Sequence, residues 1–104
     1  LHARRYETAA AAHDAGVPSC LGTDAGGSLP HGLVAHEAAE LARAGLSTIE
    51  VLTAASWGAR SWLRKPGLVE SASADLIVYQ SDPRVDIGVL AAPEHIVLRG
   101  KVVT

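Results

Sequence analysis

Three segments of the first two-thirds of the chain predict helices, 4–15, 33–44 and 47–64, and in the last two hydrophobic residues recur at helical spacing. The spacing is clearest in 33–44, where these residues fall at i, i+4, i+7 and i+8. The first segment is rich in alanine, which favours helix. Gly16 and Pro18 follow it and predict its end, because glycine adopts the left-handed cap conformation and proline cannot continue a helix.

The third helix has the strongest start signal. Ser47 and Glu50 have the spacing of a capping box, in which each side chain accepts a hydrogen bond from the other residue's free backbone N–H. Leu46 and Val51 have the spacing of a hydrophobic staple around the same turn. We therefore expect Ser47 to be the N-cap of this helix.

The segment Ser19–Thr23 has the character of a short buried strand that ends at Asp24, and Gly26 and Gly27 follow. A helix, a turn and a buried strand in this order form the αβ half of a βα repeat, so we expect an α/β fold. In such folds polar groups at the carboxyl ends of strands face a shared crevice. Asp24 is therefore the first candidate functional residue.

The pattern changes after Pro66. Short hydrophobic runs at 75–79 and 96–98 are separated by turn residues, and 102–103 can pair back on 96–98. A further short run lies at 68–69. The region from 67 to the end therefore predicts part of an antiparallel sheet.

Composition limits the class of protein. The 104 residues allow one small domain, with 48% hydrophobic residues, a formal net charge of −2 and no Phe. A core with so few large side chains is marginal by itself. The chain has no basic run, so we expect no nucleic-acid partner. It also has no apolar stretch of roughly 18 residues, so we expect no membrane partner.

The cysteine and methionine content adds two expectations. The single cysteine, Cys20, excludes an internal disulfide and fits a reducing compartment, so we expect a cytoplasmic protein. Because Cys20 lies in an apolar segment, we expect a packed and inert thiol. The chain has no methionine, even at position 1, and we therefore expect a segment of a longer protein.

Several short motifs in a fixed order resemble one family. They are Gly16-Val17-Pro18, Leu21-Gly22-Thr23-Asp24-Ala25-Gly26, Pro30-His31-Gly32, Glu37, Ala44-Gly45-Leu46-Ser47, Ala54-Ala55-Ser56, Ala74-Asp75-Leu76-Ile77-Val78 with Asp82-Pro83, and Val97-Leu98-Arg99-Gly100-Lys101-Val102. In this order they resemble the C-terminal quarter of an amidohydrolase-superfamily enzyme, of the imidazolonepropionase-like and Xaa-Pro-dipeptidase-like branch. The resemblance covers nearly the whole chain.

The resemblance implies a (β/α)₈ TIM barrel with a small β-sandwich built from both chain ends. Residues 1–66 would be the C-terminal part of the barrel, with 19–23 as its last strand, and 67–104 would be the C-terminal segment of the sandwich. Asp24 would contact a divalent metal, for which Zn²⁺ is the first candidate, and would act as general acid and base. The implied activity is hydrolysis of C–N bonds in amides, cyclic amides or dipeptides by metal-activated water.

The other metal ligands of this family have no counterpart in the sequence. The His-x-His pair of the family's first strand is absent. The ligands that the family carries on its middle strands, a Lys or Glu and two further histidines, are absent as well. A catalytic zinc usually has three protein ligands, so one carboxylate does not hold it. We therefore expect this segment alone to be inactive. Its partners would be the rest of the barrel, or another copy of the chain, and a small-molecule or dipeptide substrate.

Two residues near Asp24 are candidates for substrate binding. His31 lies in the loop beyond Asp24, and Thr23 directly precedes it. Hydrogen bonds within the loop are the plainer explanation of both residues. His36-Glu37-Ala38-Ala39-Glu40 matches the zinc-protease motif for four positions, but Glu40 replaces its second histidine. We expect a surface or packing role for that stretch.

The remaining aromatic and histidine residues have plainer interpretations. Trp57 and Trp62 are five residues apart in a helical segment and are expected to pack. His2, His13 and His95 are scattered and are expected to be solvated.

A non-catalytic structural or interaction module is the alternative function. An aspartate that precedes a glycine pair is also typical of a turn. Such a module would fold alone and leave no strand edge exposed. A barrel segment would instead leave the strand at 19–23 without its neighbours, and an exposed edge of this kind pairs with other chains.

Overall fold

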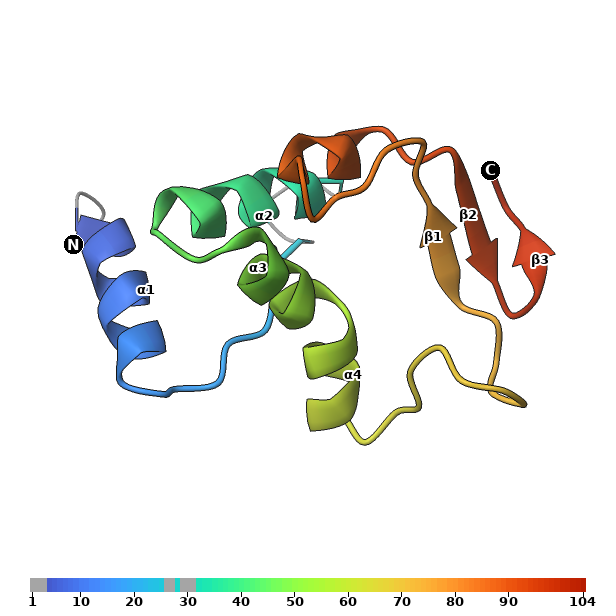
Figure 1. Ribbon diagram of the computed structural model, residues 1–104, viewed down its shortest axis with the longest axis horizontal. Coiled ribbons are helices and arrows are strands. Elements are labelled where there is room, and N and C mark those ends of the chain that lie inside the picture. The colour runs from blue at the N-terminus through green and yellow to red at the C-terminus, as the bar shows by residue number, and fades with distance from the viewer. Residues whose placement is uncertain (1–3, 26–27, 29–31) are drawn as a thin grey trace.

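A computed structural model describes residues 4–25, 28 and 32–104 of the chain (Figure 1). The described part contains four α-helices, one short 3₁₀ helix and three strands. In chain order they are α1 (Arg5–Asp14), α2 (Val34–Arg43), α3 (Thr48–Ala55), α4 (Trp57–Trp62), β1 (Leu76–Val78), η2 (Ile87–Ala91), β2 (His95–Leu98) and β3 (Lys101–Val102). The helices occupy one end of the molecule and the sheet the other (Figure 1).

The glycine signals at the ends of the first two helices are confirmed. After α1, the Gly16 N–H donates to His13 O at 2.9 Å and the Val17 N–H donates to Ala12 O at 3.0 Å. Gly16 has φ +81°, so this pair of bonds is a Schellman motif. Gly45, with φ +107°, ends α2 in the same way.

The capping box at the start of α3 is also confirmed. The Ser47 hydroxyl accepts from the Glu50 N–H at 3.2 Å, and the Glu50 carboxylate accepts from the Ser47 N–H at 2.8 Å. Leu46 and Val51 belong to one buried cluster with Ala38, which fixes α2 against α3.

The prediction of one continuous helix over 47–64 is wrong. Ser56 has φ −138° and ψ −102°, and it separates α3 from α4. Immediately after this break the backbone folds back so closely that a Cβ on Gly58 would lie 2.6 Å from the Thr53 carbonyl oxygen. A glycine at this position therefore allows the turn, which hydrophobic spacing alone does not reveal.

The core lies between α2, α3 and η2. Leu21, Ile87 and Leu90 pack against the buried cluster of Ala38, Leu46 and Val51. The short helix η2 contributes Ile87 and Leu90. It lies against α2, although in the sequence it connects β1 to β2 (Figure 1). A 3₁₀ helix of five residues is too short to give a periodic pattern, so η2 was not predicted from the sequence.

The C-terminal sheet is antiparallel, in the order β1-β2-β3. Val97 pairs with Leu76 on one side and with Val102 on the other. Arg99 and Gly100 connect β2 to β3 with φ values of +50° and +79°, which matches a two-residue type I′ hairpin turn. The predicted pairing across this turn is confirmed.

The predicted strands at 19–23 and 68–69 are absent from this structure. All residues of both segments lie in the described ranges and none is assigned to a strand. Among the described residues, the first segment has one backbone hydrogen bond to another segment, from the Leu21 N–H to Ala54 O at 2.9 Å. A strand needs a partner along its edge, and α3 is the element beside this segment. The expected position of 19–23 in a TIM barrel stays a prediction, as do the boundaries 1–66 and 67–104.

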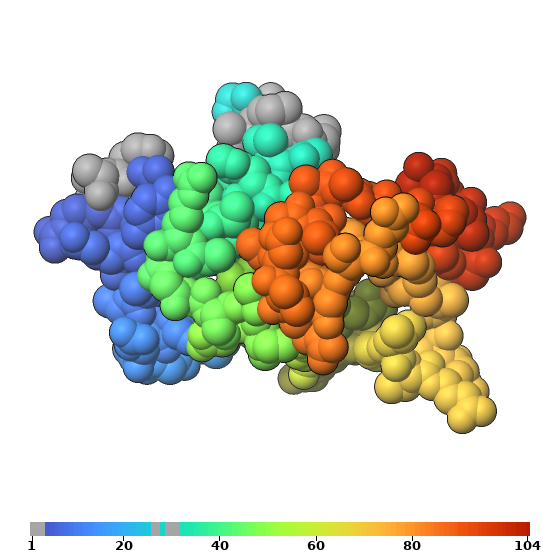
Figure 2. Space-filling view, turned by 45° about the horizontal axis from the view of Figure 1, so that its top comes forward, coloured from blue at the N-terminus to red at the C-terminus, as the bar shows by residue number. Residues whose placement is uncertain are grey.

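Three side chains that were expected to pack are exposed. Trp57 is 49% and Trp62 is 70% exposed, and the Cys20 thiol also lies at the surface. The described residues cover about half of Trp57 and less than a third of Trp62. The space-filling view shows the turn that follows α4 projecting from the body of the molecule (Figure 2). Across residues 4–25, 28 and 32–104, no helix has the length and apolar character needed to cross a membrane.

Candidate functional site

Asp24 ends an extended segment that is anchored at one point. The Leu21 side chain packs against the buried cluster, and the Leu21 N–H bonds to the last turn of α3. Three residues later, Asp24 adopts φ +54°, in the left-handed region that non-glycine residues rarely occupy. The anchored leucine and the turn place the Asp24 carboxylate at the surface.

The Asp24 carboxylate has no hydrogen bond or ion pair with the described residues. Nor do the described ranges contain a group of three or more His, Cys, Asp or Glu side chains that could hold a metal ion. The described residues therefore do not fit a metal by themselves, and the expectation that further ligands come from outside this chain stays a prediction.

Of the two candidate substrate-binding residues, Thr23 lies in the described part of the chain. The Thr23 hydroxyl accepts a hydrogen bond from the Ala25 N–H at 3.2 Å, so it supports the turn around Asp24. His31 lies outside the described residues.

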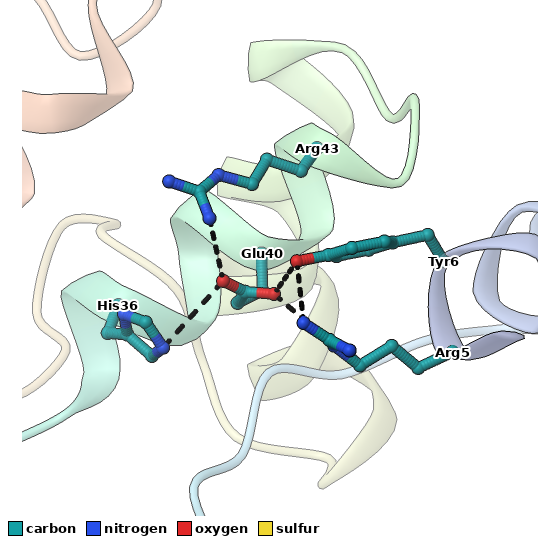
Figure 3. A network of polar contacts seen from close by, with 5 residues as sticks. All are labelled: Arg5, Tyr6, His36, Glu40 and Arg43. Carbon is teal, nitrogen blue, oxygen red and sulfur yellow. Dashed lines mark hydrogen bonds and ion pairs between the residues drawn. The ribbon is translucent and has the colours of Figure 1, made fainter. Parts of the chain in front are cut away.

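A polar network joins α1 to α2 around Glu40 (Figure 3). The Tyr6 hydroxyl donates to the Glu40 carboxylate, and the Arg5 guanidinium lies 3.7 Å from it. From α2 itself, His36 and Arg43 approach the other carboxylate oxygen at 3.7 and 3.3 Å. The Tyr6 hydroxyl, and then Arg43, Arg5 and His36, hold the pKa of the Glu40 carboxyl below its ordinary value, against the opposing effect of burial.

This network gives the zinc-protease-like stretch a structural role. Glu40 stands where the second zinc-binding histidine of that motif would be, and its carboxylate is approached by two arginines, a histidine and a tyrosine hydroxyl. The expected packing role for 36–40 therefore agrees with what the residues contact.

A second contact joins α1 to α3. The His13 imidazole lies within hydrogen-bond distance of the Glu50 carboxylate, so His13 is paired and the expectation of a solvated histidine is wrong. The backbone N–H and then the hydroxyl of Ser47, followed by His13, hold the pKa of the Glu50 carboxyl low, again against burial. Tyr6 and His13 are seven residues apart and therefore lie on one face of α1. This spacing could have predicted that the face packs against other helices, although it does not identify Glu50 as the partner.

Two hollows accompany these contacts. A cavity of about 330 Å³ lies between the end of α1, the segment 16–20, α3 and α4, and His13, Glu50 and Trp62 are among its lining residues. A wider groove of about 1400 Å³ separates the helices from the sheet (Figure 2). Tyr79 lines the groove, and burial raises the pKa of its hydroxyl. Asp24 lines neither hollow.

Comparison with other proteins finds longer relatives. No family model matches the chain. Uncharacterized proteins of Mycobacterium bovis and of two strains of Mycobacterium tuberculosis are each 52% identical to it over 101 residues. The matched region covers 97% of this chain and 27% of each relative. The chain therefore spans about a quarter of the length of these curated relatives.

Proposed function

We propose that this chain is the C-terminal segment of a metal-dependent amidohydrolase that cleaves C–N bonds in small amides, cyclic amides or dipeptides. The observation that carries the proposal is the segment from Leu21 to Asp24. Leu21 is fixed in the core, whereas Asp24 emerges exposed and in a left-handed conformation, with glycines after it in the sequence. Residues held in sparsely populated backbone regions gather at functional sites, which supports a role for this carboxylate.

The chemistry assigned to Asp24 is proton transfer. Its carboxylate would accept a proton from the attacking water and deliver it to the leaving nitrogen. A divalent metal, in the first place Zn²⁺, would supply hydroxide near neutral pH when bound. Thr23 and His31 are proposed to line the substrate side of the same loop.

The length of the relatives supports the same proposal. Because the match covers 27% of each relative, about three-quarters of those chains lie outside the matched region. Further metal ligands and the remaining barrel strands would come from such additional sequence. A cytoplasmic location belongs to the proposal, since Cys20 is free and exposed and a reducing compartment would keep it reduced.

The test uses the longest polypeptide that contains this chain, purified with its metal. We expect stoichiometric zinc by elemental analysis and hydrolysis of members of an amide and dipeptide panel. Asp24→Asn should abolish kcat, and Asp14→Asn, a matched charge removal at the end of α1, should leave it unchanged. A normal kcat for Asp24→Asn would contradict the assignment. So would a full-length protein that binds no divalent metal.

A non-catalytic interaction module is the second candidate. It is favoured by two observations, that Asp24 lines neither hollow and that large apolar side chains such as Trp62 and Leu68 are exposed at 70% and 75%. Under this alternative, the longest polypeptide that contains this chain would show no turnover with any member of the panel.

A further inference from the structure

Helix α1 has little apolar attachment to the rest of the molecule. None of its residues is buried, and four of its ten residues are alanines, whose side chains are small. Figure 1 shows α1 at the end of the molecule, joined to the remainder by an irregular segment that precedes α2. Packing of large hydrophobic side chains therefore does not hold this helix in place.

Two carboxylates do hold α1 in place, one from each neighbouring helix. Tyr6 and Arg5, near the start of α1, contact Glu40 of α2 (Figure 3). His13, two turns later on the same face, contacts Glu50 of α3. The contacts lie near opposite ends of α1, so together they fix both its position and its direction.

We propose that α1 docks on α2 and α3 reversibly and as a function of pH, bound while Glu40 and Glu50 are ionised and released when they are protonated. Release would remove one wall of the cavity of about 330 Å³ and uncover the surface around Leu46 and Trp62. This device is independent of the amidohydrolase proposal, because it uses none of the residues around Asp24.

The groups that face Glu40 favour its ionised form. Arg5 and Tyr6 approach from α1, and His36 and Arg43 approach from α2. Because these groups lower the pKa of the Glu40 carboxyl, the contact is fully present above the ordinary glutamate value of about 4.3. It is lost as the pH falls through the lower folded-state value.

The groups that face Glu50 act in the same direction. Ser47 donates to Glu50 from its own cap, and His13 approaches from α1. Protonation of the His13 imidazole adds a positive charge beside the carboxylate and keeps the contact. Only protonation of Glu50 removes it, so both contacts fail in the same acidic range.

Amide hydrogen exchange of the 104-residue chain, followed residue by residue by NMR, tests the proposal. Protection factors correct for the intrinsic pH dependence of exchange, and α3 serves as the internal reference. Between neutral pH and a pH about one unit below 4.3, we expect protection in α1 to fall at least about tenfold more than protection in α3.

Variants separate the two contacts. Glu40→Gln and His13→Gln should each lower α1 protection at neutral pH by about threefold or more without affecting α3. Glu37→Gln removes the same charge from α2 at a residue whose side chain has no hydrogen bond or ion pair with the described residues of α1, and it should change nothing. Glu50 also belongs to the capping box of α3, so a substitution there would change α3 as well as the contact to α1.

Three results would overturn the proposal. In the first, α1 and α3 lose protection together at acidic pH. In the second, α1 shows no protection at neutral pH in the unmodified chain. In the third, Glu40→Gln matches Glu37→Gln while circular dichroism shows that both variants are folded.

Discussion

The conformation of Asp24 permits a test that separates its backbone role from its carboxylate. An L-residue in the left-handed region costs roughly 1–2 kcal/mol, and glycine avoids this cost. Glycine also loses about 0.5–1 kcal/mol more conformational entropy on folding, so for Asp24→Gly the two effects nearly cancel. We expect its free energy of unfolding to stay within about 0.5 kcal/mol of the unmodified chain.

The matched variants at this position should follow the backbone, not the charge. Asp24→Asn keeps the shape and tolerates positive φ, so its stability should equal that of the unmodified chain. Asp24→Ala has no side-chain oxygen to compensate for positive φ, and we expect it to be about 1 kcal/mol less stable than Asp24→Gly. For a domain of this size that difference corresponds to about 4 °C in Tm.

The assay is urea unfolding of the 104-residue chain at 25 °C, followed by circular dichroism with equal m-values as the criterion for comparison. A loss of more than about 1 kcal/mol in Asp24→Asn would refute the reasoning. It would show that the carboxylate itself stabilises the fold, as a structural turn requires. Equal stability of the Ala and Gly variants would show that residue 24 does not have positive φ in solution.

Three further tests, two of them with a matched control substitution, address the packing of α3, its cap and the close approach at Gly58 by the same unfolding assay. Val51→Ala, at a side chain with 0% exposure, should cost about 2 kcal/mol, whereas Ile49→Ala, at 47% exposure on the same helix, should cost less than half of that. Ser47→Ala removes one bond of the capping box and should cost about 1 kcal/mol, and no change would argue against the cap in solution. Gly58→Ala places a Cβ 2.6 Å from a backbone oxygen and should cost over about 1 kcal/mol, whereas Gly67→Ala, with open space around it, should be nearly neutral; similar values for both would contradict the close approach.

The parts of the fold that the sequence predicts are those that depend on a few neighbouring residues. The capping box of Ser47 and Glu50 and the positive φ of Gly16 and Gly45 follow from local hydrogen bonds and local sterics. The hairpin at Arg99-Gly100 belongs to the same class, since two residues determine its turn.

The features that were missed depend on residues far away in the chain. A strand at 19–23 requires neighbouring strands, and the described residues provide one backbone bond from Ala54 in their place. His13 was expected to be solvated because its partner, Glu50, is 37 residues away. Exposure of Trp57 likewise depends on which segments reach it, and no local pattern reports this.

The candidate site divides in the same way. Asp24 was identified from a short pattern, and its left-handed backbone and surface position give that pattern a structural setting. The chemistry proposed for it would need metal ligands that the described residues do not provide, so the role as general acid and base stays a prediction. The network around Glu40 was missed, because a motif with its second histidine replaced gave no sign of Tyr6 and Arg5.

The position of η2 has a consequence for how the molecule comes apart. Ile87 and Leu90 complete the helical core, yet their backbone is the connection between β1 and β2. Melting the core therefore frees the loop that keeps those two strands in register, and peeling the strands apart pulls on the core. The helical and sheet halves should accordingly lose structure in one cooperative transition, with coincident midpoints for probes placed at either end.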